Sequence, residues 1–223
     1  MSLLDWIFPP RCAGCGAPGV AWCAACDASL TPQVWRVWPG VPLIAAGRLD
    51  GPWQRAIHEF KYRPRPQLAG SLAAPLIRAA RAARLPLDAI AFVPLHETRE
   101  RARGFNQAER LCRVIAPALG CGLASGLTRV HATLPQVRLD EAARRANLDG
   151  AFRWEGPLPV GRLGLLDDVV TTGATLEAAA AAVQQAGGRV SAALALAVRG
   201  GARARAPQTL AAPGVTFPDS PVL

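Results

Sequence analysis

A pair of adjacent carboxylates followed by a short run of small, hydroxylated residues is the feature of this sequence best suited to chemistry. Asp167 and Asp168 follow the apolar run 163–166, and after two valines come Thr171, Thr172, Gly173, Ala174 and Thr175. At the start of a helix, such a loop offers free backbone N–H groups and the positive end of the helix dipole, which suit a phosphate. The two acids can accept hydrogen bonds from ribose hydroxyls, with a divalent cation reducing the repulsion between them. The segment therefore predicts a site for a ribose 5-phosphate.

The elements that must position this site can be inferred from its flanks. The run 163–166 predicts a buried parallel strand, because ligand crevices in open α/β sheets lie beyond the carboxyl ends of such strands. The alanine-rich segment 176–186 predicts a helix that ends at Gly187-Gly188. An alternative without a ligand fits the same residues: a strand, a turn and a helix whose first turn is capped by a threonine.

Four cysteines near the amino terminus form a second chemical pattern. Two Cys-x-x-Cys pairs, separated by seven residues, are made by Cys12, Cys15, Cys23 and Cys26. The two-residue gap lets both thiolates of a pair point at one ion, and the second pair completes a tetrahedron with no open position. We therefore expect a structural Zn²⁺ ion held by four thiolates, with a redox pair or disulfides as the alternative.

Cationic residues near a second predicted strand are candidates for anion contacts. The apolar run 90–95 predicts a buried strand whose carboxyl end opens onto the same crevice as Asp167. The candidates for contact with pyrophosphate or a DNA backbone are Lys61, His96, Arg99, Arg101 and Arg103. For Lys61, the only lysine, the alternative is a cation placed against a helix dipole. For His96 the alternative is a structural role, and for the arginines it is simple solvation.

The remaining elements follow from periodicity and from residues that begin or end helices. Helices are predicted over 53–62, 67–84, from the capping residue Asn106 to Leu119, and over 140–147; strands are predicted over 35–38, 41–46 and 190–198. Five of the six tryptophans fall in the first quarter of the chain. They either supply core to a small module or, if exposed, stack on unpaired bases.

Composition indicates a globular protein with polyanionic partners. The 223 residues, 51% of them hydrophobic, suffice for one α/β domain plus a small module. A net charge of +9 and a pI near 10.5 favour nucleic acid or phosphorylated small molecules as partners, although the excess arginine extends along the whole chain. Because neither a run of about eighteen uncharged apolar residues nor a secretion signal occurs, we expect a cytoplasmic protein with no membrane span.

Taken in order, these motifs resemble those of the ComF family, in which an amino-terminal zinc module precedes a type I phosphoribosyltransferase-like domain. The segment 163–175 on its own resembles the 5-phosphoribosyl-1-pyrophosphate (PRPP) motif of type I phosphoribosyltransferases. The resemblance covers residues 1 to about 199. It rests on the paired Cys-x-x-Cys motifs, Lys61-Tyr62, Val93-Pro94-Leu95-His96, Arg103-Gly104-Phe105-Asn106-Gln107, Thr133 with Gln136, Arg145-x-Asn147, Gly150-Ala151-Phe152 and the segment 163–175.

The resemblance implies an α/β fold: a parallel sheet flanked by helices, with the small four-cysteine zinc module in front. The expected organisation is a zinc-binding module over 1–35, a linker with short strands over 36–52, the phosphoribosyltransferase-like domain over 53–199 and a mobile carboxyl-terminal tail over 200–223. It further implies that Asp167 and Asp168 are the catalytic residues, which hold the ribose of PRPP with Mg²⁺. Residues 171–175 would bind the 5-phosphate, and the stretch around 140–147 would close over the ligand.

The implied function is binding of PRPP, or another ribose 5-phosphate ligand, together with single-stranded DNA in natural transformation. The setting would be the bacterial cytoplasm, alongside a helicase-like partner. The alternative is an active PRPP-dependent phosphoribosyltransferase of nucleotide metabolism or salvage, whose acceptor the sequence does not identify. As a binding protein, the chain would use the same ribose 5-phosphate site without consuming its ligand.

Overall fold

A seven-stranded sheet forms the centre of the protein in the computed structural model, which describes residues 10–38, 40–63, 65, 68–130, 148 and 150–199 and the backbone of 208–209. Its strand order is β4-β3-β7-β8-β2-β1-β9. Neighbouring strands from β4 to β2 are parallel, and β1 and β9 add an antiparallel edge. The strands are β1 (Gln33–Trp38), β2 (Val41–Arg48), β3 (Ala89–Phe92), β4 (Gly122–Ala124), β7 (Leu163–Val170), β8 (Val190–Val198) and β9 (Gln208–Thr209).

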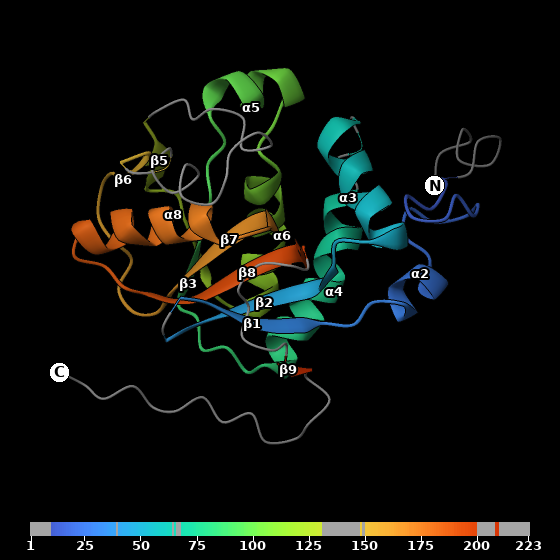
Figure 1. Cartoon of the computed structure of the whole chain (residues 1–223), viewed down its shortest axis with the longest axis horizontal. Coiled ribbons are helices and arrows are strands. Elements are labelled where there is room, and N and C mark those ends of the chain that lie inside the picture. Colours follow the sequence, from blue (N-terminus) through green and yellow to red (C-terminus); the bar gives the residue numbers. More distant parts are fainter. Residues whose placement is uncertain are drawn as a thin grey trace.

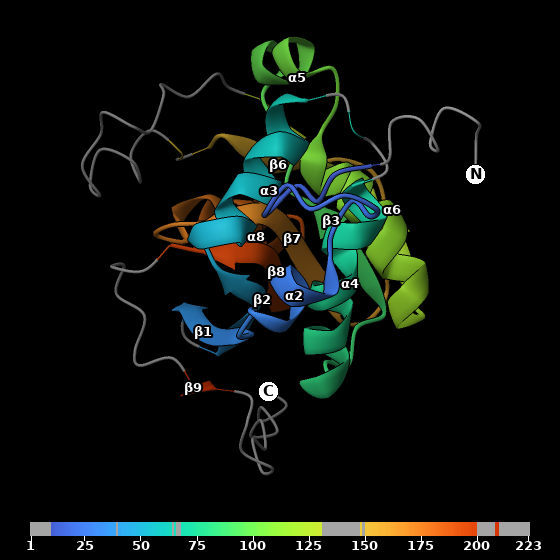
Figure 2. The same cartoon turned by 90° about the vertical axis from the view of Figure 1, so that its right-hand side faces the viewer.

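Helices cover both faces of this sheet (Figures 1 and 2). On one face lie α3 (Gly51–Tyr62), α4 (Leu68–Ala82) and α6 (Gln107–Leu119). The other face is covered by α8 (Ala174–Gln185) and by a small antiparallel pair, β5 (Leu127–Arg129) and β6 (Phe152–Trp154). Helix α5 (Glu97–Arg103) stands apart above the sheet, and α2 (Ala24–Ala28) belongs to the amino-terminal module. The predicted fold class is thus confirmed as α/β with a mostly parallel sheet.

The central strands are apolar up to Asp167 on β7 and at every position except Ser191 on β8, because both of their faces are covered. On β7, Leu166 packs with the cluster under α3, α4 and α6, whereas Leu165 packs with the cluster under α8. All of β8 except Ser191 is buried. Such continuous apolar runs are typical of parallel strands sandwiched between helices. The two clusters together hold the carboxyl ends of the strands in fixed positions.

Several element boundaries differ from the predicted ones. The strand predicted over 163–166 continues to Val170, because Asp167, Val169 and Val170 pair with β8. The two acids therefore lie within β7 and do not follow it. Residues 36–52 were assigned to a linker with short strands, but β1 and β2 are integral to the sheet and β2 pairs in parallel with β8. The predicted helices at 53–62, 67–84 and 107–119 and the strand at 190–198 are confirmed.

Some predictions concern residues outside the described part of the chain. These are the helix over 140–147 with its expected closing role, and nearly all of the tail 200–223, in which only the backbone of β9 is described. Among the tryptophans, Trp35 and Trp53 are buried, as the core interpretation predicts. No helix within the described ranges is long and apolar enough to cross a membrane.

Candidate functional site

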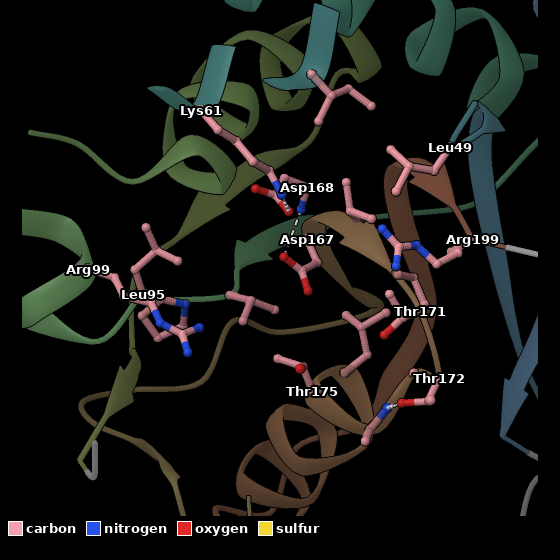
Figure 3. Close-up of a pocket in the computed structure, with 18 of the residues that line it drawn as sticks. Leu49, Lys61, Leu95, Arg99, Asp167, Asp168, Thr171, Thr172, Thr175 and Arg199 are labelled. Atoms are coloured by element: carbon pink, nitrogen blue, oxygen red, sulfur yellow. Dashed lines mark hydrogen bonds and ion pairs between the residues drawn. The ribbon is translucent and has the colours of Figure 1, made fainter. Parts of the chain in front are cut away.

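A cavity of about 540 Å³ opens beyond the carboxyl ends of β2, β7 and β8 (Figure 3). This volume lies in the range of about 300–1,000 Å³ that is usual for small-molecule sites. The predicted residues that line it are Lys61, Arg99, Arg103, Asp167, Asp168, Thr171, Thr172, Gly173, Ala174 and Thr175. The fold therefore brings both acids, the small-residue loop and three of the five candidate cationic residues to one place.

Asp168 is the more enclosed of the two acids. Its side chain lies on the α3 side of β7 and accepts a hydrogen bond from Lys61 Nζ at 2.9 Å, forming an ion pair in which both side chains are less than one-fifth exposed. The sequence predicts Lys61 as a contact for pyrophosphate or DNA. In the structure its ammonium is instead bound to Asp168 and joins α3 to β7.

Asp167 faces the cavity from the same strand (Figure 3). One carboxylate oxygen accepts a hydrogen bond from the backbone N–H of Asp168 at 2.8 Å. Burial raises the pKa of Asp167 to about 7; the charge of Asp168 adds to this effect, whereas the charges of Lys61 and Arg129 oppose it. A carboxylate that carries such a cost is stabilised by an added cation, so its oxygens suit Mg²⁺ or a ribose hydroxyl.

The loop after β7 turns sharply into helix α8. Gly173 precedes the helix with φ of +87°, a left-handed conformation that strongly favours glycine. The backbone N–H of Ala174 donates a hydrogen bond to Thr172 Oγ1 at 3.4 Å. Because the first turn of α8 lines the cavity, its backbone N–H groups and dipole make it a candidate anion site.

Cationic side chains surround this anion site. Arg99, Arg103, Arg129 and Arg199 all line the cavity. The guanidinium of Arg103 lies 5.2 Å from the ring centroid of Tyr62 and donates to Gln107 Oε1 at 3.0 Å. Burial lowers the pKa of Arg129, and the charge of Arg99 lowers it further, which indicates that two guanidinium groups share the cavity wall. An anionic ligand would relieve this repulsion.

Two predicted candidates do not line the cavity. His96 caps the start of α5, where its ring nitrogen Nδ1 accepts a hydrogen bond from the backbone N–H of Thr98 at 3.3 Å. Arg101 is exposed and pairs with Glu97 one turn away on the same helix. Both side chains thus make contacts local to α5.

The cavity wall also includes residues that were not singled out from the sequence, among them Leu49, Gln54, His58, Arg129 and Arg199. Leu49 and Arg199 each follow a strand directly, so a rule that inspects the first residue beyond every predicted strand would have found them. Arg129 ends β5, and the short length of that strand gave no periodic signal.

The amino-terminal cysteines meet the geometric requirements of a zinc site. All four sulfur atoms lie within 4.8 Å of one another, with 3.9 Å between Cys12 and Cys26 and 3.6 Å between Cys15 and Cys23. Four thiolates at about 2.3 Å from a central Zn²⁺ lie about 3.8 Å apart. Although burial raises the pKa of Cys12, backbone hydrogen bonds from Cys15, Cys23 and Gly14 outweigh it and lower that pKa to about 6. The four cysteines therefore fit one structural Zn²⁺ ion.

The zinc module is attached to the α/β domain mainly through α3. The rings of Trp22 and Trp53 lie 5.0 Å apart, and Arg55 Nε donates to the carbonyl of Gly14 at 2.6 Å. Trp53 is buried, and its indole N–H donates to the carbonyl of Leu196 on β8 at 2.9 Å. Helix α3 therefore contacts the zinc module at one end and carries Lys61 to the cavity at the other.

Comparison with known proteins identifies the amino-terminal module. The family model for the Double zinc ribbon domain matches residues 3–36. Two solved structures were found to be similar. Orotate phosphoribosyltransferase from Aeropyrum pernix is 22% identical with a TM-score of 0.35, and the match covers 60% of this chain and 58% of that chain. Adenine phosphoribosyltransferase from Trypanosoma brucei is 11% identical with a TM-score of 0.41, and the match covers 76% of this chain and 87% of that chain. At these TM-scores we draw no conclusion about the site from either likeness.

Relatives of similar length extend the comparison beyond the zinc module. DNA utilization protein YhgH of Salmonella typhi is 37% identical over 172 residues, and that of Escherichia coli (strain K12) is 34% identical over 172 residues; each match covers 74% of both chains. Competence protein F of Haemophilus influenzae is 32% identical over 177 residues, 75% of both chains. The four-cysteine module, the parallel sheet and this identity lead to one conclusion: the chain belongs to the ComF/YhgH family.

Proposed function

We propose that the cavity binds PRPP, or a related ribose 5-phosphate ligand, together with Mg²⁺. One observation carries this proposal: Asp167, the loop 171–175 and the first turn of α8 line the same cavity as four arginines. The 5-phosphate would accept hydrogen bonds from the backbone N–H groups of the loop, as at other helix amino termini. Asp167 would hold the ribose hydroxyls or the cation, and Arg99 and Arg129 would face the pyrophosphate.

In this arrangement Asp168 acts mainly through Lys61. The pair holds α3 against β7, so the ammonium balances one of the two acidic charges without occupying the cavity centre. Mg²⁺ would add positive charge beside Asp167 and neutralise part of the pyrophosphate charge. The chain's own residues would orient the ribose and position its C1 between the arginine-lined wall and the opposite end of the cavity.

Thermal unfolding of the full chain tests this binding directly. PRPP with Mg²⁺ should raise the melting temperature, because a ligand that binds only the folded state stabilises it. The variant Asp167→Asn with Asp168→Asn should lose this shift, whereas Arg189→Gln, at the exposed amino end of β8, should retain it. An undiminished shift in the double variant would place the ligand elsewhere.

The proposed biological role is binding of single-stranded DNA during its uptake or utilisation. It is supported by the net charge of +9 and by the names of the relatives, which refer to DNA utilization and competence. Such binding should weaken steeply as salt is raised, because counterions are released when arginines contact phosphates. Fluorescence anisotropy with a labelled oligodeoxynucleotide at rising salt measures it, and absence of binding at low salt would exclude this role.

A second candidate function is phosphoribosyl transfer, and the arginines of the cavity wall favour it because they would stabilise the pyrophosphate as it leaves. In that reaction the bond from C1 to pyrophosphate breaks, a bond from C1 to the acceptor nitrogen forms, and the acceptor proton moves to a base. Release of pyrophosphate during incubation with PRPP, Mg²⁺ and candidate acceptors would distinguish transfer from binding alone.

A further inference from the structure

The ion pair between Lys61 and Asp168 puts a fixed cation beside the two acids of the cavity. Nζ of Lys61 lies 2.9 Å from Oδ1 of Asp168, and the two side chains are only 18% and 12% exposed. Water and salt therefore screen the ammonium charge weakly. Figure 3 shows the Lys61 side chain extending to Asp168, with Asp167 next to it. A metal ion bound to either acid would lie close to the ammonium and would be repelled by it.

The backbone at Lys61 is anchored on two sides. Phe60, the preceding residue, is buried, and the carbonyl of Lys61 accepts a hydrogen bond from Nε2 of Gln107 at 3.4 Å. Gln107 is fully buried, and its Oε1 accepts a second hydrogen bond from Arg103 at 3.0 Å. Because these contacts hold the main chain, only a rotation of the side chain itself would take the ammonium away from Asp168.

Stabilisation of α3 alone does not account for this placement. Lys61 lies in the last turn of the helix, where a cation is favourable against the helix dipole. That role is fulfilled equally well by an ammonium in water. Here the ammonium is instead largely buried against an acid on β7. The contact therefore acts on the acids as well as on the helix.

The charge of the cavity lining opposes a free divalent cation. Within the described part of the chain, the lining holds five cationic side chains, Lys61, Arg99, Arg103, Arg129 and Arg199, and two acidic ones, Asp167 and Asp168. A metal ion that entered alone would add to this excess of positive charge. A phosphorylated ligand, by contrast, carries the negative charge that offsets it.

We infer, resting on the proposed function, that Lys61 is a built-in counter-cation that keeps a divalent metal ion off the acid pair until a phosphorylated ligand brings one. With the ammonium in place, Asp168 is already paired and Asp167 is the carboxylate of the two that is left for a metal ion. Mg²⁺ is usually held by one or two carboxylates together with phosphate oxygens of a substrate. The phosphates thus complete the coordination, so the metal ion and the ligand enter together.

Binding of Mn²⁺ in the absence of any ligand tests this inference without turnover. Mn²⁺ prefers the same oxygen ligands as Mg²⁺, and electron paramagnetic resonance measures its free concentration in a titration of the full chain at pH 8. The wild type should bind Mn²⁺ weakly. Lys61→Met should bind it on the order of tenfold more tightly, because the repulsion from the ammonium is removed. Mg²⁺ alone should likewise raise the melting temperature of Lys61→Met but not that of the wild type.

Two matched variants separate charge from packing. Lys61→Arg keeps the positive charge and should bind Mn²⁺ as weakly as the wild type. Lys61→Met combined with Asp168→Asn should lose the gain, because the second carboxylate is missing. Equal binding by the wild type and Lys61→Met would overturn the inference, as would a gain that persists in either matched variant. If Lys61→Met does not fold, Lys61→Gln takes its place.

The response to PRPP with Mg²⁺ keeps this inference separate from the proposed function. Folded Lys61→Met should retain the rise in melting temperature, because Lys61 acts on the acids and not on the ligand. Loss of that rise in Lys61→Met alone would overturn the inference, since the ammonium would then be a ligand contact. If the wild type itself shows no rise, the proposed function fails, while the comparison of Mn²⁺ binding without ligand still decides the role of Lys61.

Discussion

Asp167 and Asp168 are adjacent on one strand, yet they have different surroundings. Asp168 is balanced by Lys61 at 2.9 Å, whereas Asp167 lies next to a like charge and faces the cavity. The raised pKa of Asp167 means that the folded protein binds a proton there more tightly than the unfolded chain does. The folded state therefore carries a cost at this residue when the carboxyl is charged and no ligand is bound.

Replacing Asp167 with asparagine should stabilise the ligand-free protein at pH 8. In the unfolded wild-type chain the Asp167 carboxyl has a pKa of about 4. Its stabilising contribution to the folded state is therefore complete below about pH 4 and is lost as the pH rises through about 7. Asparagine removes that loss, so the free energy of unfolding at pH 8 should rise by on the order of 2 kcal/mol. Urea unfolding of both proteins at pH 4 and pH 8 measures the difference.

The difference in stability between Asp167→Asn and the wild type should grow between about pH 4 and pH 7 and stay constant at higher pH. Asp88 has the opposite shift, since hydrogen bonds from Arg162 lower its pKa to about 2, and it contributes to pH dependence only below about pH 4. The variant should be more stable and yet respond less to PRPP with Mg²⁺. A variant less stable than the wild type at pH 8 would contradict the assignment of strain to the charged carboxyl.

At the scale of elements, the pair of Lys61 and Asp168 joins α3 to β7. Because both side chains are largely buried, removing one partner leaves the other charge without compensation. A double-mutant cycle with Lys61→Met and Asp168→Asn should show a coupling free energy of about 1–3 kcal/mol in urea unfolding. Additive single effects would show that the pair does not hold the two elements together.

Helix α6 begins at a buried capping residue that also anchors the loop from β3. Asn106 Oδ1 accepts hydrogen bonds from the backbone N–H groups of Ala108 and Glu109, and its amide donates to the carbonyl of Val93. Asn106→Ala should therefore lower the free energy of unfolding by about 1–2 kcal/mol. Asn106→Ser, which keeps the capping acceptor, should recover part of this loss; equal losses in the two variants would show that the cap contributes little.

At the scale of the whole molecule, sequence patterns predicted most elements but not how distant segments meet. Helix α8, strand β8 and the cap of α6 were predictable because alanine content, apolar runs and a capping asparagine act locally. Strand β2 was predicted only as a short strand within a linker, because Pro39 and Gly40 precede it and Pro42 is its second residue. Its pairing with β8, about 150 residues away, is a tertiary contact without a local signal.

In the candidate site, too, local patterns were predictable and contacts between distant segments were not. The acids, the loop 171–175 and the four cysteines were predicted because their spacing is itself the chemical pattern. The pairing of Lys61 with Asp168 was not predictable, since 107 residues separate the two side chains that meet in the fold. Arg199 was missed because its place in the cavity wall depends on the end of β8 that it follows and on the neighbouring end of β2.

The zinc module should contain one Zn²⁺ ion per chain. Loss of this ion should destabilise the α/β domain as well as the module. Cys12→Ser with Cys15→Ser should abolish the bound zinc, measured by elemental analysis, and lower the melting temperature of the full chain because Trp22 packs on Trp53. A full-length wild type purified without chelators that contains no zinc would contradict the four-thiolate assignment.

Helix α3 contacts the zinc module through Trp53 and Arg55 and reaches the cavity through Lys61. If this helix couples the two binding sites, the coupling free energy is the same in both directions. When bound zinc raises the affinity for PRPP by some factor, bound PRPP must raise the affinity for zinc by the same factor. Titration of the wild type with a chromogenic chelator should therefore extract zinc less readily when PRPP and Mg²⁺ are present. The rigid helix would thus link the metal supply of the cell to its phosphoribosyl supply within one chain.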